Sequence, residues 1–577
     1  MLVVLAAVLT AYATLTQINL KTTRSSANQA VGFYAAEGGL NLRAEVIRNT
    51  FVGFNRPVGP GPTTANPCTG TDMGANDFAC KSYTFKGRQV PTYVIEDTSA
   101  SNSGFQIPAG ELYAGLTAQQ YTYNVYSRAT GTNGKPEAVL TMKFQSRLVP
   151  LFQFMAFYQK DLEILPGADM NLNGPIHTNG SLYLNANTTS TINGQITVSG
   201  SFNRGRKDQN ACGGTVNVYD PGTAKSINCN GGATSQIPQS SLDAWNGQIK
   251  TAVTQVTVPP TDSFNPTAGN SFWDKADLRI MANYNLIPPV AEVRNGDNSV
   301  NPVLTTLLAT SGAVTFSNSF YNNREGKSIK MMDVDQVKLM NAIQKSATAG
   351  VSLLGPGKDL SDKTEGGLIF YLGADGPNAG NTCSPTNAAA CSINNYGTRI
   401  TNAATLGASA STYPSAPAIQ GLSIVSNQAM YTQGDYNAIN KKPASIIADS
   451  LNVLSNNWND SNGGPGLAPS ATPTTLNAAF LAGTDGTVGS SYNGGLENYP
   501  RLHESWNGAS ATLTYRGSFV SLGQPQHVNG PWSAQKYSAP KRDWQFDTDF
   551  KNAANLPPLS PRFVYLRQQL FSRSYDQ

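Results

Sequence analysis

Charge and histidine are scarce in this chain of 577 residues: Asp, Glu, Lys and Arg make up 13% of it, and there are three histidines. The sequence contains no Gly-x-x-x-x-Gly-Lys phosphate loop, no Gly-x-Ser-x-Gly nucleophile motif and no His-Glu-x-x-His zinc motif. His177 lies far in sequence from His503 and His527, and no paired acidic motif typical of glycosidic cleavage is present. These absences argue against hydrolases and nucleotide-dependent enzymes, so we expect no catalytic residue and no cofactor.

Metal-binding motifs are also missing. Asp333/Asp335 and Asp547/Asp549 are close acidic pairs, but neither sits in the Gly-containing acidic loop that Ca²⁺ sites favour. We therefore expect no metal site.

Cysteine is rare, and none of the six cysteines has Cys-x-x-Cys or His-spaced metal geometry. Fifteen pairings are possible in principle. The cysteines nevertheless form three couples that are close in sequence, Cys68/Cys80, Cys212/Cys229 and Cys383/Cys391. This spacing predicts three local disulfides, and with them an oxidising compartment outside the inner membrane.

Glycine and proline are abundant, at 54 and 34 residues, and Asn, Ser and Thr crowd the sequence. This composition is typical of many short strands and turns in an extracytoplasmic protein. The length allows two to four domains. The net charge of +4 permits contact with anionic polymers without requiring it.

The N-terminal segment has helical character throughout. Residues 1–20 contain no charge, and as a helix they would rise about 30 Å, which is enough for one membrane span. Small or apolar residues then recur at helical intervals: Val31, Tyr34, Ala35, Gly38 and Leu42. A cleaved export signal is the alternative, but no Lys or Arg precedes the apolar run and no small-x-small cleavage site closes it. We expect a single helix over residues 1–50.

Three strands are predicted after this helix, at residues 90–96, 121–129 and 138–148. In the last of them, Leu140, Met142 and Phe144 alternate with polar residues, which indicates a strand with one buried face. Residues 131–135 supply the turn before it. We expect residues 51–160 to form an antiparallel sheet that covers half of the helix.

A 20-residue internal repeat follows. Residues 170–183 align with residues 190–203, and five of the aligned positions are identical. They are Asn173/Asn193, Gly174/Gly194, Ile176/Ile196, Gly180/Gly200 and Ser181/Ser201. Rungs of this length, with apolar residues inside and Gly or Asn at the corners, predict a β-solenoid. His177 corresponds to Thr197, so we expect His177 to point outward.

The remaining domain boundaries follow from this pattern of short strands and turns. We expect the solenoid to cover residues 161–500 with insertions, including a helix at residues 333–344. Residues 501–577 offer further strands, which could return to the sheet formed by residues 51–160. Trp532 and Trp544 are expected to pack on these strands. The predicted fold class is mainly β with a long N-terminal helix.

Residues 33–41, FYAAEGGLN, resemble the end of the N-terminal helix of PilX-type minor pilins. Residues 320–327, 434–437, 442–450 and 492–501 resemble the large extracytoplasmic region of ComZ-like competence pilins, a family that joins a PilX-like N-terminus to a β-solenoid. The chain departs from the pilin pattern because it shows neither a basic leader nor an early glutamate. We therefore expect it to begin a few residues inside the natural N-terminus.

The resemblance implies a minor subunit at the tip of a type IV pilus, which takes part in pilus assembly and in DNA capture for natural transformation. It also implies other minor and major pilins, the inner-membrane assembly machinery and extracellular DNA as partners. The subunit would wait in the inner membrane and later stand on the cell-surface pilus. The assembly helix of the family corresponds here to Tyr34, Ala35, Ala36, Glu37 and Gly38.

Two basic segments are candidate DNA contacts. Arg204, Arg206 and Lys207 directly follow the second repeat, and Lys541 and Arg542 form the other segment. A solvated turn is the alternative for both. The 24 tyrosines could stack on single-stranded bases or on sugars. A surface adhesin or carbohydrate-binding pilus component is therefore the second hypothesis, and a secreted β-helix enzyme that degrades polysaccharide is the third.

Overall fold

The computed structural model describes residues 1–51, 57–63, 67–220, 223–383, 394–466, 468–490, 492, 495–507, 510–528 and 537–574. The chain forms two compact units, Met1–Val149 with Arg562–Gln577, and Pro150–Pro561. Residues 150–160 thus lie in the second unit, whereas the sequence analysis grouped them with the sheet of residues 51–160. Residues 501–561 also lie in the second unit, whereas the sequence analysis grouped them with the C-terminal strands.

The first unit is built on α1 (Leu2–Thr50), a single helix of 49 residues. Its sheet has the order β1-β2-β4-β5-β34, and β3 pairs with β4. The strands are β1 (Lys81–Phe85), β2 (Arg88–Glu96), β3 (Asn102–Gln106), β4 (Thr117–Thr130), β5 (Pro136–Pro150) and β34 (Arg562–Ser574). The second unit is therefore inserted in sequence between two neighbouring strands of this sheet.

The sheet of the first unit buries one face against the second half of α1. Leu140, Met142 and Phe144 of β5 point into this core, as their alternation predicted. From Gln145 to Pro150 every residue of β5 is buried, because both faces of the strand are covered there. Small residues on α1 allow the close packing that joins the helix to the sheet.

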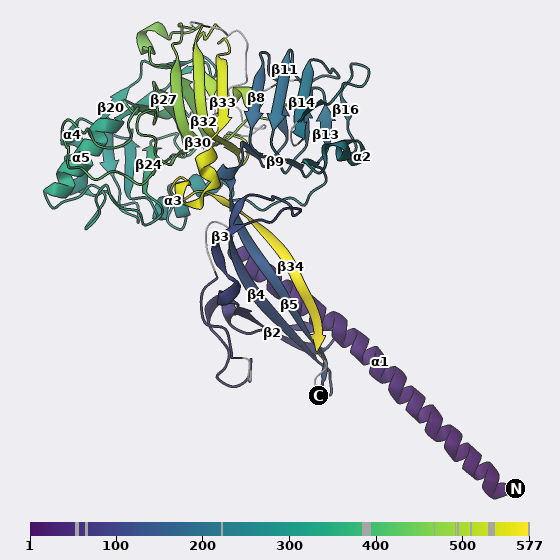
Figure 1. Ribbon diagram of the computed structural model, residues 1–577. Helices are drawn as coiled ribbons and strands as arrows, with labels where there is room; N and C mark the ends of the chain where they lie inside the picture. The colour runs from purple at the N-terminus through teal and green to yellow at the C-terminus, as the bar shows by residue number, and fades with distance from the viewer. Residues whose placement is uncertain are drawn as a thin grey trace. The chain divides into compact units, whose positions relative to one another are not determined.

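The second unit begins with a three-sided solenoid (Figure 1). Its strands are β6 (Ala156–Tyr158), β7 (Leu162–Ile164), β8 (Met170–Asn173), β9 (Ile176–Thr178), β10 (Leu182–Leu184), β11 (Thr189–Asn193), β12 (Ile196–Val198), β13 (Phe202–Arg204) and β14 (Thr215–Asp220). In the parallel pairs, Ile176 lies opposite Ile196, and Leu182 lies opposite Phe202. This register confirms the 20-residue rung.

The end of the solenoid at β12, β13 and β14 is closed by short elements that do not follow the 20-residue repeat. They are β15 (Thr223–Ser226), β16 (Ser235–Gln236), α2 (Gln239–Leu242) and β17 (Ile249–Lys250). β15 and β16 pair antiparallel with β14 and β13, so they end two of the three parallel sheets.

The rest of the second unit winds a second stack of rungs. Its strands are β18 (Leu278–Asn283), β19 (Val290–Val293), β20 (Val314–Ser317), β21 (Tyr321–Asn322), β22 (Lys327–Ser328), β23 (Lys330–Asp335), β24 (Leu368–Asp375), β25 (Tyr396–Thr401), β26 (Leu422–Val425), β27 (Ala429–Gln433), β28 (Ala444–Ala448), β29 (Ser450–Leu454), β30 (Thr474–Ala482), β31 (Arg501–Leu502), β32 (Thr512–Ser521) and β33 (Lys541–Phe546).

Both stacks share one sheet, with the order β17-β12-β9-β6-β32-β30-β28-β26-β24-β18-β19. The chain therefore enters the solenoid in its middle at β6 and winds out to β17. It then crosses to the far end at β18 and returns strand by strand to β32, which pairs with β6. The entry and exit of the unit adjoin, because the backbone N–H of Leu151 donates to the carbonyl of Pro561 at 2.8 Å.

Three helices belong to the second stack: α3 (Ser271–Asp274), α4 (Pro302–Ser311) and α5 (Gln336–Thr348). The predicted helix at residues 333–344 starts later than expected, because residues 333–335 complete β23 and Asp335 caps the helix by accepting from the N–H of Lys338. The sequence analysis missed α4, which lies with α5 at one end of the unit in Figure 1.

Candidate functional site

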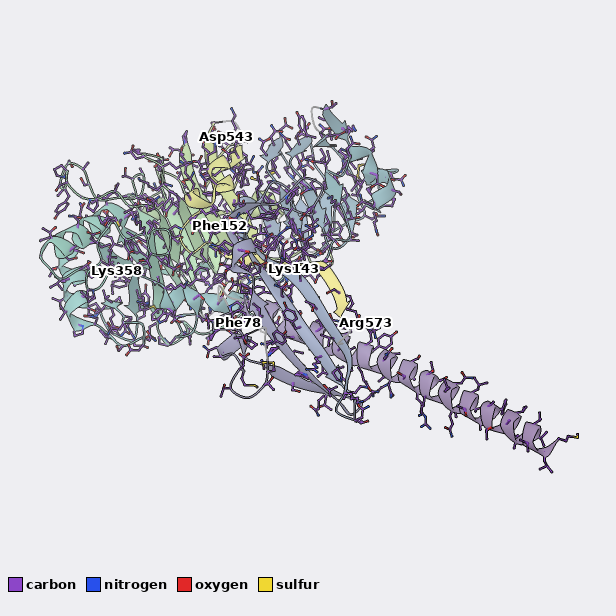
Figure 2. The ribbon with its side chains drawn as sticks, turned by 60° about the horizontal axis from the view of Figure 1, so that its bottom comes forward. Phe78, Lys143, Phe152, Lys358, Asp543 and Arg573 are labelled. Atoms are coloured by element: carbon purple, nitrogen blue, oxygen red, sulfur yellow. A yellow bond between two sulfur atoms is a disulfide. The ribbon has the colours of Figure 1, made fainter. Side chains whose placement is uncertain are left out.

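The first 30 residues of α1 are exposed along their whole length (Figure 2). Within the described part of the chain, α1 is the one helix long and apolar enough to cross a membrane, with a mean hydropathy of 1.6 over its best window. Apolar side chains such as Leu5 and Leu9 are exposed, and no described part of the chain covers them. They require a membrane or another protein.

The predicted assembly segment is divided between two faces of α1. Ala35 and Ala36 are buried against the sheet, and the hydroxyl of Ser127 donates to the carbonyl of Ala36 at 2.7 Å. Gly38 lies under the ring of Phe85, where an added Cβ would come within 3.2 Å. Tyr34 is 70% exposed on the outer face, and Glu37 is half-buried. Tyr34 is thus the residue of this segment that a partner would meet first.

Arg43 is a structural residue of α1 that the sequence analysis missed. It is fully buried, and its Nη2 atom donates to the carbonyls of Asp77 and Ala79 at 2.7 and 2.8 Å. Burial lowers the pKa of its guanidinium. Its three- and four-residue spacing from Leu40, Gly39 and Ile47 was the available signal that it faces the sheet.

Two predicted disulfides are present. Cys68 bonds Cys80 in the first unit, and Cys212 bonds Cys229 in the second. Cys383 is also disulfide-bonded, whereas Cys391 lies outside the described residues.

Arg204 is not part of a binding surface, and this corrects the sequence prediction. The residue is 1% exposed, and burial lowers the pKa of its guanidinium. The group donates to backbone carbonyls and to one side chain, at 2.7 to 3.1 Å: those of Ile227, Leu184, Gly213 and Gly214, and Oδ1 of Asn185. β13 is in the last full rung, and Arg204 supplies donors there to the loop carbonyls of Ile227, Gly213 and Gly214.

Arg206 and Lys207 are each paired. Arg206 forms a two-point ion pair with Asp208 at 2.9 Å and lies 5.0 Å from the ring centre of Tyr492. Lys207 lies 2.9 Å from Asp161. The structure therefore does not bring the three basic residues together as a free cationic corner.

The second basic segment is also divided. Lys541 is exposed at the start of β33, but Arg542 is largely covered, with its guanidinium 5.3 Å from the ring centre of Trp544. Burial lowers the pKa of Arg542. Trp544 is buried as expected, and Trp532 lies outside the described residues.

His177 lies on the opposite face of β9 from Ile176, but this face is covered, so His177 is buried. It is fully buried and stacks on Phe157, with ring centres 5.0 Å apart. Its Nδ1 atom lies 2.8 Å from the hydroxyl of Thr197, and Nε2 lies 3.1 Å from Oδ1 of Asn179. Burial lowers its pKa to about 4. The sequence analysis did not predict this burial, because the chain that covers this face includes Val256, which is distant in sequence and bonds to Asn179 beside His177.

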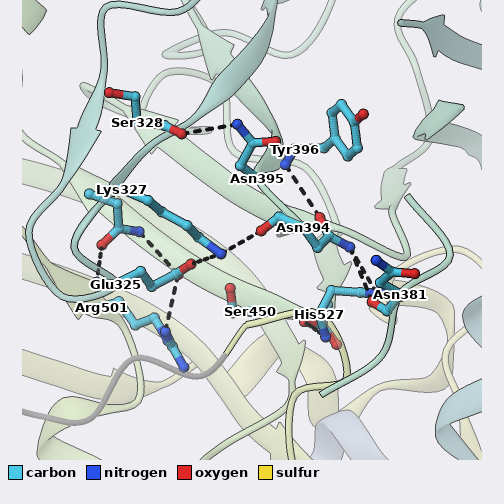
Figure 3. A network of polar contacts seen from close by, with 12 residues as sticks. Glu325, Lys327, Ser328, Asn381, Asn394, Asn395, Tyr396, Ser450, Arg501 and His527 are labelled. Atoms are coloured by element: carbon cyan, nitrogen blue, oxygen red, sulfur yellow. Dashed lines mark hydrogen bonds and ion pairs between the residues drawn. The ribbon is translucent and has the colours of Figure 1, made fainter. Parts of the chain in front are cut away.

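A buried polar network holds the β21–β22 loop (Figure 3). Glu325 lies 3.3 Å from Arg501 and 3.2 Å from Lys327, and the Lys327 ammonium donates to the carbonyl of Asn394. The amide of Asn394 lies 3.1 Å from Nδ1 of His527. The Glu325 and Arg501 side chains are 2% and 3% exposed. These paired groups fasten the loop to neighbouring rungs.

Glu163 on β7 is a buried carboxyl that the sequence analysis did not single out. Burial raises its pKa to about 7, and the charge of Glu497 acts in the same direction, against a hydrogen bond from Thr487 and the charge of Lys207. Its side chain is covered by the turn Leu496–Asn498. A pKa near 7 suits a general acid, but this group is 5% exposed.

Comparisons with known proteins add little. No family model matches the chain, and no curated protein matches it. The chain is similar to one solved structure, described as the crystal structure of competence-associated pilin ComZ from Thermus thermophilus. The identity is 11% over 94% of this chain and 97% of that chain, with a TM-score of 0.25. A similarity this weak leaves function to be argued from the residues of this chain.

Proposed function

We propose that the chain is a minor, PilX-like subunit of a type IV pilus that presents its solenoid as a DNA-capturing unit. The contrast along α1 carries this proposal: residues 1–30 are exposed throughout, while Ala35, Ala36, Leu40 and Ile47 pack on the sheet. A helix made in this way can lie first in a membrane and then in the core of a filament. The apolar half contacts lipid or other helices, and the second half packs on the sheet of the folded unit.

The other parts of the proposal rest on size, chemistry and the resemblance to competence pilins. The second unit makes up most of the chain, and a subunit with so large an insertion would crowd its neighbours along a shaft, which favours the pilus tip. The role is one of binding, without catalysis. Its partners would be other pilins, the inner-membrane assembly machinery and extracellular DNA.

Two variants separate anchoring from assembly. Leu9→Asp places a charge in the apolar half of α1 and should remove the chain from the membrane fraction, since a charge at the centre of a span costs about 3 kcal/mol. Tyr34→Asp changes an exposed residue beyond the span. It should leave the chain in the membrane but reduce its amount in sheared pili.

The matched control is Asn28→Asp, which changes an exposed residue of the same helix between the two sites. It should leave both fractions near wild type. If Tyr34→Asp and Leu9→Asp both appear in sheared pili at wild-type levels, α1 is not an assembly element and the proposal is wrong.

A further inference from the structure

Two adjoining grooves lie on the second unit beside α5. The first has a volume of about 430 Å³ and runs between α4, α5 and the loop at Tyr413. The second has a volume of about 640 Å³ and follows residues 405–419, with Lys442 at its rim. Tyr413 lines both grooves. Two grooves that share a wall suit an extended ligand better than a compact one.

The charged residues lining the grooves are all cations. They are Lys338 and Lys345 in the first groove and Lys442 in the second, and among the described lining residues there is no carboxylate. Lys345 and Lys442 form no ion pair with a described residue, and Lys338 is 60% exposed with its nearest carboxylate, Asp335, 3.8 Å away. These ammonium groups are available to an anion.

The geometry of α5 places its donors in a row. Lys338, Asn341 and Lys345 are three and four residues apart and so lie on one face of the helix, with the two lysines about 10 Å apart along its axis. Oδ1 of Asn341 accepts from the N–H of Ser409 at 2.8 Å, which fixes the amide against the loop. Hydroxyls of Thr310, Ser311 and Thr412 complete the first groove.

This lining selects an anionic ligand rich in acceptors. Sugar hydroxyls usually need carboxylate or amide acceptors, whereas ammonium groups suit phosphate oxygens. Each groove has the volume of a small-ligand site, and the ring of Tyr413 stands between them, where an unpaired base can stack. In a duplex the base faces are already stacked on one another, so a tyrosine at this place would have no partner.

We propose that these two grooves bind an unpaired DNA strand, with its phosphates on Lys338, Lys345 and Lys442 and a base on Tyr413. This inference rests on the proposed function and names the site of its DNA capture. The site replaces the basic corner at Arg204, whose side chain is buried.

The test compares two triple variants of the full chain in detergent, each of which lowers the net charge by three. K338Q/K345Q/K442Q removes the groove cations. The control, K81Q/K86Q/K135Q, removes three exposed lysines of the first unit. Binding is measured with a short fluorescent oligothymidylate over a range of salt concentrations. The groove variant should lose about tenfold or more in affinity at low salt, and its slope of log K against log[salt] should fall by up to about 2.

The control variant should stay within about twofold of wild type, because its lysines lie outside the grooves. Tyr413→Leu should weaken oligothymidylate binding roughly 5- to 100-fold without changing the salt slope, and should leave binding of an abasic strand unchanged. Thermal unfolding of each variant reports whether it has folded; Lys→Arg changes at the three groove positions should restore the slope.

Each result is decisive. If wild type binds but both triple variants weaken equally, the groove is not the site, while the proposed function stands. If wild type does not bind oligothymidylate even at low salt, DNA capture fails, while the membrane and pilus assays of α1 are unaffected. If a duplex competes as well as a single strand per nucleotide, the preference for unpaired DNA is wrong.

Discussion

Replacing Arg204 should destabilise the end of the first solenoid stack without acting on ligand binding. The guanidinium makes five hydrogen bonds, four of them to backbone carbonyls around β13, and one of these four carbonyls belongs to Leu184 of β10. Arg204→Ala would remove a donor from each of these buried acceptors and leave a cavity, although the carbonyl of Leu184 and Oδ1 of Asn185 would still accept from the N–H groups of Gly205 and Gly213. Arg204→Met retains most of the volume and removes the donors alone.

The size of the effect follows from the chemistry of these bonds. A hydrogen bond to a charged group contributes about 1.5–3 kcal/mol, but the five are not additive because water and backbone shifts recover part of the loss. We expect Arg204→Ala to lower the local free energy of unfolding by roughly 3–5 kcal/mol. Arg206→Ala breaks an ion pair whose side chains are 21% and 10% exposed, and it should cost less than Arg204→Ala, about 1 kcal/mol.

Hydrogen exchange followed by mass spectrometry on peptides from residues 202–229 measures this stability locally. Exchange there should accelerate strongly in both Arg204 variants and little in Arg206→Ala, with peptides of the first unit unchanged. Equal exchange in the Arg204 and Arg206 variants would refute the structural role of Arg204. So would a loss of DNA binding by Arg204→Ala with wild-type exchange.

Two further changes test the packing of each unit. The pKa of Glu163 is raised from 4.5 to about 7, so its neutral form favours the folded state. The free energy of unfolding should therefore fall by roughly 3 kcal/mol as pH rises from 4 to 9. Glu163→Gln should remove this contribution, as measured by urea titrations at each pH. A Cβ at Gly39 would lie 2.6 Å from Cγ1 of Val90, so Gly39→Val should cost about 1–3 kcal/mol in thermal unfolding; Asn41→Val, on the exposed face, should cost less than about 1 kcal/mol.

Local pattern was sufficient for the repeated parts of the fold. The 20-residue spacing that pairs Ile176 with Ile196 placed the rungs correctly, since parallel stacking requires equivalent residues to meet at each turn. The alternation of Leu140, Met142 and Phe144 identified the buried face of β5, because successive side chains of a strand point to opposite faces of the sheet.

Sequence reasoning failed where a residue's surroundings come from distant parts of the chain. Arg204 looks like a surface cation because arginine is seldom buried. Its acceptors at Ile227 and Gly213 come from loops that no local period describes. The grooves were missed because Lys442 and the loop at Tyr413 are far in sequence from Lys338 and Lys345 of α5 and line adjoining grooves only in the folded unit.

The strand order of the shared sheet has a consequence for how the protein is made. β6 is synthesised early, but its neighbour β32 emerges only near the end of the second unit. Until then the first stack presents an unpaired parallel edge, which can join other chains in the same situation. Closing this seam is a pairing between residues distant in sequence and is therefore expected to be slow. The chain would be most prone to aggregate in that interval, before the last strands arrive.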